Sequence, residues 1–218
     1  YLVATTGKVE IVNPEVFKSI GAVIGDLDQP RSLATSRGKL FISDYGPYDA
    51  SFNTPNSYIA VVSGLDGGVV KKKIEVSSKP EDLYSVGKYV FVAGSEEGKI
   101  EIIDAETETI AKTIEVSGKP VQFFEARGDL WVYSYDAEMI YFQSFHLDNL
   151  TKQNSQEMPL ANPTSRIALD EEDRIYILTS SGWPDYSDGI TIFSLFESTF
   201  IPDWKTGSGF YGIGYDLD

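Results

Sequence analysis

Short stretches of alternating apolar and polar residues recur along the chain, separated by turns of charged residues or glycine. The clearest example is "GKIEIIDAETETIAKTIEVSGKP" from Gly98 to Pro120, where "KIEIID" alternates, "AETE" turns and "TIAKTIEVS" runs back. Alternation with a period of two is typical of a β-strand, and turn residues between two such runs predict a hairpin. Helical periodicity is essentially absent, so the pattern predicts an all-β chain.

A proline motif divides these strands into repeats. "KIEVSSKPEDLY" and "TIEVSGKPVQFF" share the core Ile-Glu-Val-Ser-x-Lys-Pro, and related prolines stand at positions 30, 80, 120 and 163. Each proline is followed by a short strand, a turn and an apolar strand, and a third and fourth strand complete the copy. Antiparallel four-stranded units of about 40 to 50 residues are typical of β-propeller blades. We therefore expect an all-β propeller with blades at approximately 30–79, 80–119, 120–162 and 163–205.

The two ends of the chain predict a further blade. Residues 1–29 supply three strands, "YLVATT", "KVEIVN" and "SIGAVIG", whereas residues 206–218 supply one. Together they would form one shared blade and close a ring of five within a single domain of residues 1–218. The other interpretation is that the chain is a piece of a larger ring, and the sequence leaves both open.

One blade resembles a known repeat. The segment "YVFVAGSEEGKIEIIDAETETIAKTIEVSGKPVQF", Tyr89 to Phe123, is similar to the YVTN-type β-propeller repeat of YncE-like proteins in "YVFVAG", "IEIIDAETE" and "TIAKTIEVSGKP". The match decays in "MIYFQSFHLDNL" and "ITIFSLFES". The resemblance implies a bacterial or archaeal protein of the periplasm or cell surface, in some cases a lipoprotein, that serves as a binding scaffold. It also implies a seven-bladed ring, which at this period needs roughly 300 residues.

The charge and the composition argue against several classes of function. The 33 acidic and 18 basic residues give a net charge of −15, which argues against nucleic-acid partners because phosphate backbones are repelled. The chain has no cysteine, which excludes thiolate chemistry, disulfides and cysteine-ligated zinc. No apolar run approaches the ~20 residues that span a bilayer, so we expect no transmembrane segment. The opening "YLVATTGKVE" is not a signal peptide, and any lipid anchor would lie outside these residues.

Two long loops after second strands are the candidate binding site. They are "SDYGPYDASFNTPNS" from Ser43 to Ser57 and "SSGWPDYSDG" from Ser180 to Gly189, and in a propeller both would open on one rim. Long loops on a rigid scaffold often carry binding, and aromatic residues in them supply contact area at small entropic cost. The candidate contact residues are Tyr45, Tyr48, Phe52, Trp183 and Tyr186, with Asp44, Asp185, Arg31 and Arg166 as polar partners. The alternative is that these aromatics pack against their own loops.

The acidic residues suggest an alternative function, that of an enzyme. Calcium prefers oxygen ligands, so acids near the channel mouth would suit a calcium-dependent hydrolase of phytase-like or lactonase-like type. The acids with useful placement are Glu81, Asp82 and Glu125 on first strands, and Asp44, Asp136 and Asp185 at the ends of second strands. No Asp-x-Asp-x-Asp loop is present, and His146, the single histidine, predicts no triad. We therefore expect a non-catalytic scaffold that binds a glycan, peptide or protein on one rim and has no cofactor or metal.

Overall fold

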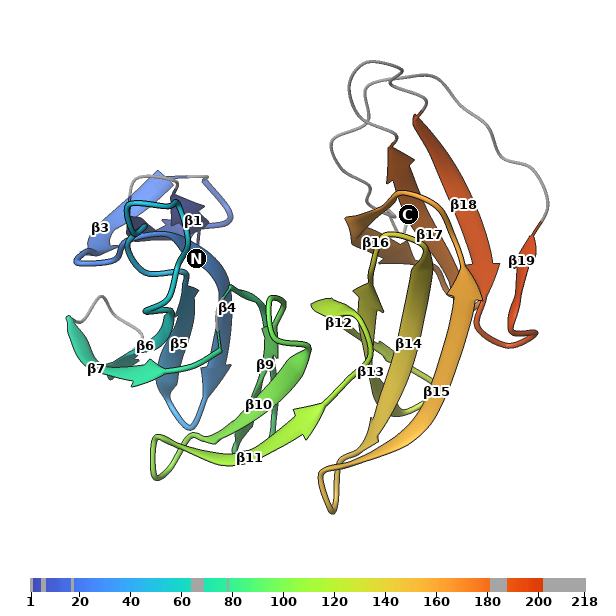
Figure 1. The fold of residues 1–218 in the computed structure, drawn as a ribbon. Coiled ribbons are helices and arrows are strands. Elements are labelled where there is room, and N and C mark those ends of the chain that lie inside the picture. Colours follow the sequence, from blue (N-terminus) through green and yellow to red (C-terminus); the bar gives the residue numbers. More distant parts are fainter. Residues whose placement is uncertain are drawn as a thin grey trace. The chain divides into compact units, whose positions relative to one another are not determined.

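A computed structural model of the chain describes residues 2–4, 7–16, 18–63, 69–77, 79–180 and 188–201. The described residues form nineteen β-strands, labelled β1 to β19, and no helix, so no membrane-spanning helix is found among them. Every pairing between neighbouring strands is antiparallel, and four of the five sheets have four strands. The predicted fold class, an all-β fold of four-stranded antiparallel blades, is confirmed. Figure 1 shows the strands of each sheet side by side.

The chain divides into two compact units, Tyr1–Pro120 and Val121–Asp218. Unit 1 holds three sheets, and its first sheet has three strands in the described residues: β1 (Leu2–Ala4), β2 (Lys8–Asn13) and β3 (Lys18–Ile24). The second sheet comprises β4 (Pro30–Ser36), β5 (Lys39–Asp44), β6 (Tyr58–Ser63) and β7 (Val70–Glu75). The third comprises β8 (Pro80–Val86), β9 (Tyr89–Gly94), β10 (Lys99–Asp104) and β11 (Thr109–Glu115).

Unit 2 holds two further four-stranded sheets. One comprises β12 (Lys119–Ala126), β13 (Asp129–Tyr135), β14 (Met139–His146) and β15 (Thr151–Pro159). The other comprises β16 (Pro163–Leu169), β17 (Arg174–Ser180), β18 (Asp188–Ser194) and β19 (Thr199–Ile201). Residues 206–218, predicted to share a blade with residues 1–29, lie outside the described residues, so the shared blade stays a prediction.

The first strand of each four-stranded sheet begins at the motif proline or one residue before it. Proline fixes φ and cannot donate to a ladder, so it suits the first position of a strand. The hairpins that follow turn on residues with positive φ, such as Arg37 at 51° and Gly38 at 70°. Arg127 at 56° and Gly128 at 79° repeat this turn in unit 2. Two consecutive left-handed residues match the twist of the flanking strands, which is why "RG" directs these hairpins.

The sheets of unit 1 pack face to face. One cluster joins Phe41 and Val61 of the second sheet to Val90 and Val92 of the third, and all four side chains are fully buried. Another cluster joins the first sheet to the second. The second and third strands are therefore covered on both faces, whereas the outermost strand β11 is mostly exposed.

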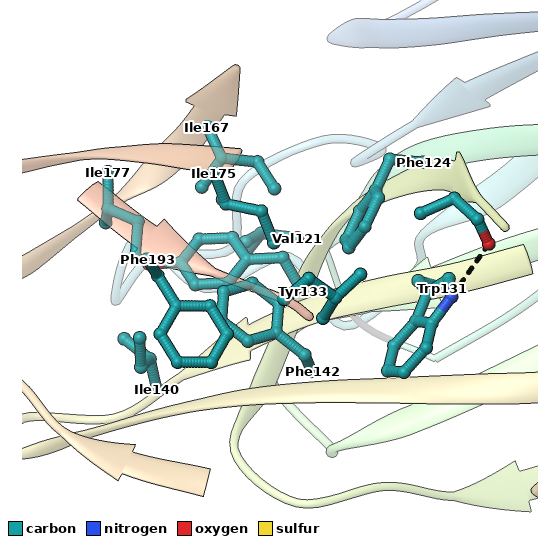
Figure 2. Packing of buried hydrophobic residues seen from close by; sticks show 12 residues of the cluster. Val121, Phe124, Trp131, Tyr133, Ile140, Phe142, Ile167, Ile175, Ile177 and Phe193 are labelled. Carbon is teal, nitrogen blue, oxygen red and sulfur yellow. Dashed lines mark hydrogen bonds between the residues drawn. The ribbon is translucent and has the colours of Figure 1, made fainter. Parts of the chain in front are cut away.

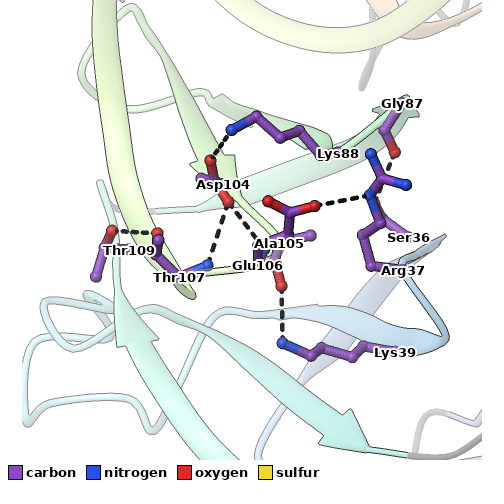
Figure 3. Close-up of polar contacts among 10 residues, drawn as sticks. All are labelled: Ser36, Arg37, Lys39, Gly87, Lys88, Asp104, Ala105, Glu106, Thr107 and Thr109. Atoms are coloured by element: carbon purple, nitrogen blue, oxygen red, sulfur yellow. Dashed lines mark hydrogen bonds and ion pairs between the residues drawn. The ribbon is translucent and has the colours of Figure 1, made fainter.

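Turns at the ends of β4 and β10 add polar contacts between the second and third sheets (Figure 3). The Lys39 ammonium donates to the carbonyl of Ala105 at 2.8 Å and pairs with Glu108 at 2.6 Å. The Ser36 hydroxyl donates to the carbonyl of Gly87 at 2.9 Å. These contacts fix the relative position of two blades at the end opposite the loop that follows β5.

The core of unit 2 is aromatic. The rings of Phe142 on β14 and Phe193 on β18 stack with centroids 5.0 Å apart (Figure 2). Tyr133 stacks on Phe142 at 5.6 Å, and its hydroxyl donates to the carbonyl of Thr164 at 2.9 Å. Trp131 is 5% exposed, and its indole N–H donates to the carbonyl of Ala126 at 3.2 Å. Each polar end is thus satisfied while the ring is buried, as a stable aromatic core requires.

Candidate functional site

The loop of residues 45–57, hereafter the rim loop, leaves the second strand β5 and returns into the third strand β6. It is hydrogen bonded to both connections between sheets in unit 1. The backbone N–H of Tyr45 donates to the carbonyl of Gln29 at 3.2 Å, before β4. The backbone N–H of Lys79 donates to the hydroxyl of Ser57 at 3.2 Å, before β8. The rim loop and these connections therefore lie together, as expected for one rim of a propeller.

Asp44 anchors the beginning of the rim loop. Its carboxylate is fully buried and accepts three backbone hydrogen bonds: from Asp28 at 2.9 Å, from Gln29 at 2.9 Å and from Gly46 at 2.7 Å. Amides donating to an ionised acceptor make strong hydrogen bonds, and three of them offset the cost of burying the charge. Asp44 thus fastens the connection before β4 to the base of the rim loop.

Tyr45 holds the loop against the first strands of two sheets. Its side chain is 6% exposed, and its hydroxyl donates a hydrogen bond to the carboxylate of Glu81 on β8. The guanidinium of Arg31, on β4, lies 4.3 Å from the centre of the Tyr45 ring, close enough for a cation–π interaction. Arg31 is itself exposed. Tyr45 is therefore a supporting residue, whereas Arg31 is accessible at the rim.

The tip of the rim loop is held by Asp49. Its side chain accepts the backbone N–H groups of Ser51 at 2.8 Å and Asn53 at 2.9 Å, and these bonds hold the pKa of the carboxyl below its usual value. The backbone N–H of Asp49 donates in turn to the carbonyl of Asn53 at 2.9 Å. Phe52 has a φ of 61°, a left-handed conformation that a bulky residue adopts only when its surroundings enforce it. These contacts therefore hold the tip of the rim loop in one defined conformation.

Two aromatic side chains project from this tip. Tyr48 is 54% exposed and Phe52 is 80% exposed. Their ring centroids are 6.2 Å apart and the ring planes meet at 62°, so each supports the other edge to face. Such a pair offers apolar contact area, and aromatic residues are enriched in protein interfaces.

A small hollow lies beside the tip. Asn53, Thr54, Pro55, Lys79 and Glu96 line it, and its volume is about 170 Å³. The Lys79 ammonium donates to Glu96 at 2.5 Å, and this bond holds the pKa of the Glu96 carboxyl below its usual value. The Thr54 side chain is 2% exposed, and its hydroxyl has no hydrogen-bond partner among the described residues.

The predicted site residues thus divide into distinct groups. Asp44 and Tyr45 are buried and support the rim loop, whereas Tyr48, Phe52 and Arg31 are exposed. Arg166 is exposed on β16 and belongs to unit 2. Trp183, Asp185 and Tyr186 lie outside the described residues, so their part in the site stays a prediction.

The acids considered for a hydrolase mostly serve other purposes in the described structure. Glu81 accepts from the Tyr45 hydroxyl, and Asp82 accepts from the Ser32 hydroxyl at 2.8 Å. Asp136 caps a turn by accepting backbone N–H groups of the following residues, and Glu125 is exposed on β12. Within the described ranges, no group of three or more histidine or acidic side chains could hold a metal ion.

The single histidine belongs to unit 2, whereas the rim loop belongs to unit 1. His146 is at the end of β14, its side chain is 47% exposed, and its Nδ1 lies 3.9 Å from the carboxylate of Asp148. Asp148 is itself 94% exposed. This geometry is that of a surface residue at the end of a strand.

Sequence reasoning missed the residues that line the hollow: Thr54, Lys79 and Glu96. Lys79 belongs to the "SKP" motif, and Glu96 belongs to the "SEEGK" turn between two strands. Topology could have indicated these residues, because Lys79 and Glu96 both adjoin the rim loop once the order of the blades is known. Thr54 carries no pattern of its own.

No protein-family model matches this chain, and no curated protein matches it. Among solved structures, hydrazine synthase from Kuenenia stuttgartiensis, a β-propeller-containing protein, is similar, with a TM-score of 0.67 at 15% sequence identity. The alignment covers 87% of this chain and 57% of that one, so this chain spans a little over half the neighbour's length. At this identity the similarity shows the fold alone, and it supports the propeller assignment.

Proposed function

We propose that this propeller is a non-catalytic scaffold that binds a glycan, peptide or protein through the rim loop of unit 1. The proposal rests on the contrast between the buried base of the rim loop and its exposed tip. The base is fixed by Asp44 and its three backbone hydrogen bonds, whereas the tip presents Tyr48 and Phe52 to solvent. A loop ordered in advance loses little entropy when a ligand binds, so its exposed aromatic area contributes more fully to affinity.

A comparison of aromatic variants on glycan and peptide arrays tests this proposal. The parent chain and the double variant Tyr48→Ala, Phe52→Ala are screened side by side, with Phe196→Ala as the matched control. Phe196 is also exposed, at 71%, but it lies in unit 2. We expect at least one ligand to bind the parent and the control but to bind the double variant about tenfold more weakly or worse. Equal binding by all three proteins would contradict the proposal.

The cellular location is part of the same proposal. We propose that the protein has repeats of the YVTN type and acts in the periplasm or at the cell surface. The similarity of Tyr89 to Phe123 to that repeat and the absence of cysteine support it. Fractionation of the native cells followed by immunoblotting is the test. Recovery of the protein in the cytoplasmic fraction alone would contradict it.

A further inference from the structure

The hollow beside Phe52 narrows the kind of ligand that the rim loop would take, an inference that rests on the proposed function. Phe52 directly precedes Asn53 and Thr54, which line the hollow, so the aromatic tip adjoins the polar hollow along the chain. The hollow of about 170 Å³ is smaller than the ~300 Å³ pockets that enclose drug-sized ligands. It accepts one ring-sized group while the rest of the ligand lies over the loop.

The polar lining of the hollow is neutral overall. Lys79 and Glu96 neutralise each other at 2.5 Å, and both side chains are partly exposed, at 36% and 40%. An anionic ligand at Lys79 would be repelled by Glu96 and by the net charge of −15, whereas a cationic ligand at Glu96 would displace Lys79. An uncharged group that both donates and accepts hydrogen bonds meets both partners without separating charges. Hydroxyl groups have this property.

Thr54 gives a second, independent indication of a polar ligand. Its side chain is 2% exposed, and its hydroxyl has no hydrogen-bond partner in the described part of the chain. Buried hydroxyls without a partner are rare, and each one calls for an explanation such as a water or ligand at that position. The Thr54 oxygen itself is buried, so a ligand hydroxyl in the hollow would provide the missing partner once the side chain turns its hydroxyl toward the hollow.

We propose that the hollow and the aromatic tip together form a subsite for a neutral saccharide. One sugar ring would occupy the hollow, with its hydroxyls on Thr54, Lys79 and Glu96. An adjoining sugar would place its apolar C–H face on the ring of Phe52 or Tyr48. The two ring planes meet at 62°, so they present apolar faces in two directions along such a chain.

The experiment is a titration of the full chain with neutral gluco-, manno- and galacto-oligosaccharides, by saturation-transfer NMR and calorimetry. The diagnostic variant is Thr54→Val, which keeps the side-chain shape but removes the unpaired hydroxyl. We expect saccharide binding to weaken about fivefold while the melting temperature stays the same or rises, because the variant no longer buries an unpaired polar group. A hydroxyl with only a structural role would leave binding unchanged.

Glu96→Gln provides a second variant, and Glu97→Gln is its matched control. The neighbouring Glu97 is also exposed but pairs with Lys99 at 2.9 Å. We expect Glu96→Gln to weaken saccharide binding and Glu97→Gln to leave it unchanged. Affinity should also stay constant within a factor of about two when salt is raised from about 50 to about 500 mM, because a neutral ligand is not screened.

The outcomes separate this inference from the proposed function. If the parent binds no saccharide, and the Tyr48→Ala, Phe52→Ala variant loses binding to a charged ligand or a peptide, the saccharide subsite is overturned. The rim then remains a binding surface. Saccharide binding that Thr54→Val and Glu96→Gln both leave unchanged also overturns the subsite. Binding that is insensitive to the aromatic double variant overturns both.

Discussion

Replacing Asp44 by asparagine should destabilise the protein measurably although the two side chains have the same shape. In the parent, Asp44 Oδ1 accepts the backbone N–H groups of Gln29 and Gly46, and Oδ2 accepts that of Asp28. The amide of asparagine retains one oxygen and replaces the other by an NH₂ group, which faces a donor and cannot accept. One buried charge-assisted hydrogen bond is then lost and one backbone N–H is left unpaired, which costs about 2 to 3 kcal/mol.

Urea unfolding followed by circular dichroism measures this effect as a shift of the midpoint at constant slope. Asp148→Asn is the matched control, because Asp148 is 94% exposed and should change stability by less than about 0.5 kcal/mol. Limited proteolysis of Asp44→Asn should also cleave the rim loop faster than in the parent. A midpoint for Asp44→Asn equal to that of the control would refute the view that this carboxylate fastens the rim loop.

The remaining predictions concern pH, a backbone position and the core. Stability should decrease as pH falls below about 3.8, the ordinary aspartate value, because the hydrogen bond that the Lys88 ammonium donates to Asp104 lowers the folded-state pKa of the Asp104 carboxyl, so the unfolded state takes up the proton first. An acid titration that shows no loss of stability by pH 2 would be inconsistent with this. Gly46→Ala should destabilise the protein by about 1 to 3 kcal/mol in urea, because Gly46 has a φ of 72° and a Cβ there would lie 2.3 Å from a backbone oxygen of the same loop; an unchanged midpoint would disprove it. Phe142→Ala should cost about 3 to 5 kcal/mol, because its ring is fully buried, whereas the exposed Phe196→Ala should cost little; similar losses in both would contradict the aromatic core.

The sequence alone determined the strands and their order within each sheet. The alternating run "KIEIID" coincides with β10, Lys99–Asp104, and the motif prolines mark the beginning of each first strand. These features are local: alternation, a turn residue and a proline each act within a few positions of the backbone. Hairpins between consecutive strands follow from the same short-range rules, which is why four-stranded antiparallel sheets could be predicted.

The sequence also placed the rim loop, but it could not tell which of its aromatics would be exposed. The two alternatives were binding and packing within the loop, and the structure shows that exposure differs along the loop, since Tyr45 is 6% exposed whereas Phe52 is 80% exposed. The difference arises because Tyr45 meets Glu81, thirty-six residues away on another sheet. Nothing near Tyr45 in the sequence encodes that partner.

Tertiary structure also decided the roles of the charged residues. Asp44 became an anchor because the pairing of β4 with β5 sets Pro30 opposite Asp44 and so brings the N–H groups of Asp28 and Gln29 to it across fifteen or sixteen residues. Lys79 and Glu96 came to line one hollow because each adjoins the rim loop in space. Backbone patterns depend on neighbours along the chain and can be deduced from their order, whereas the role of a side chain depends on partners that only packing brings within a few ångströms.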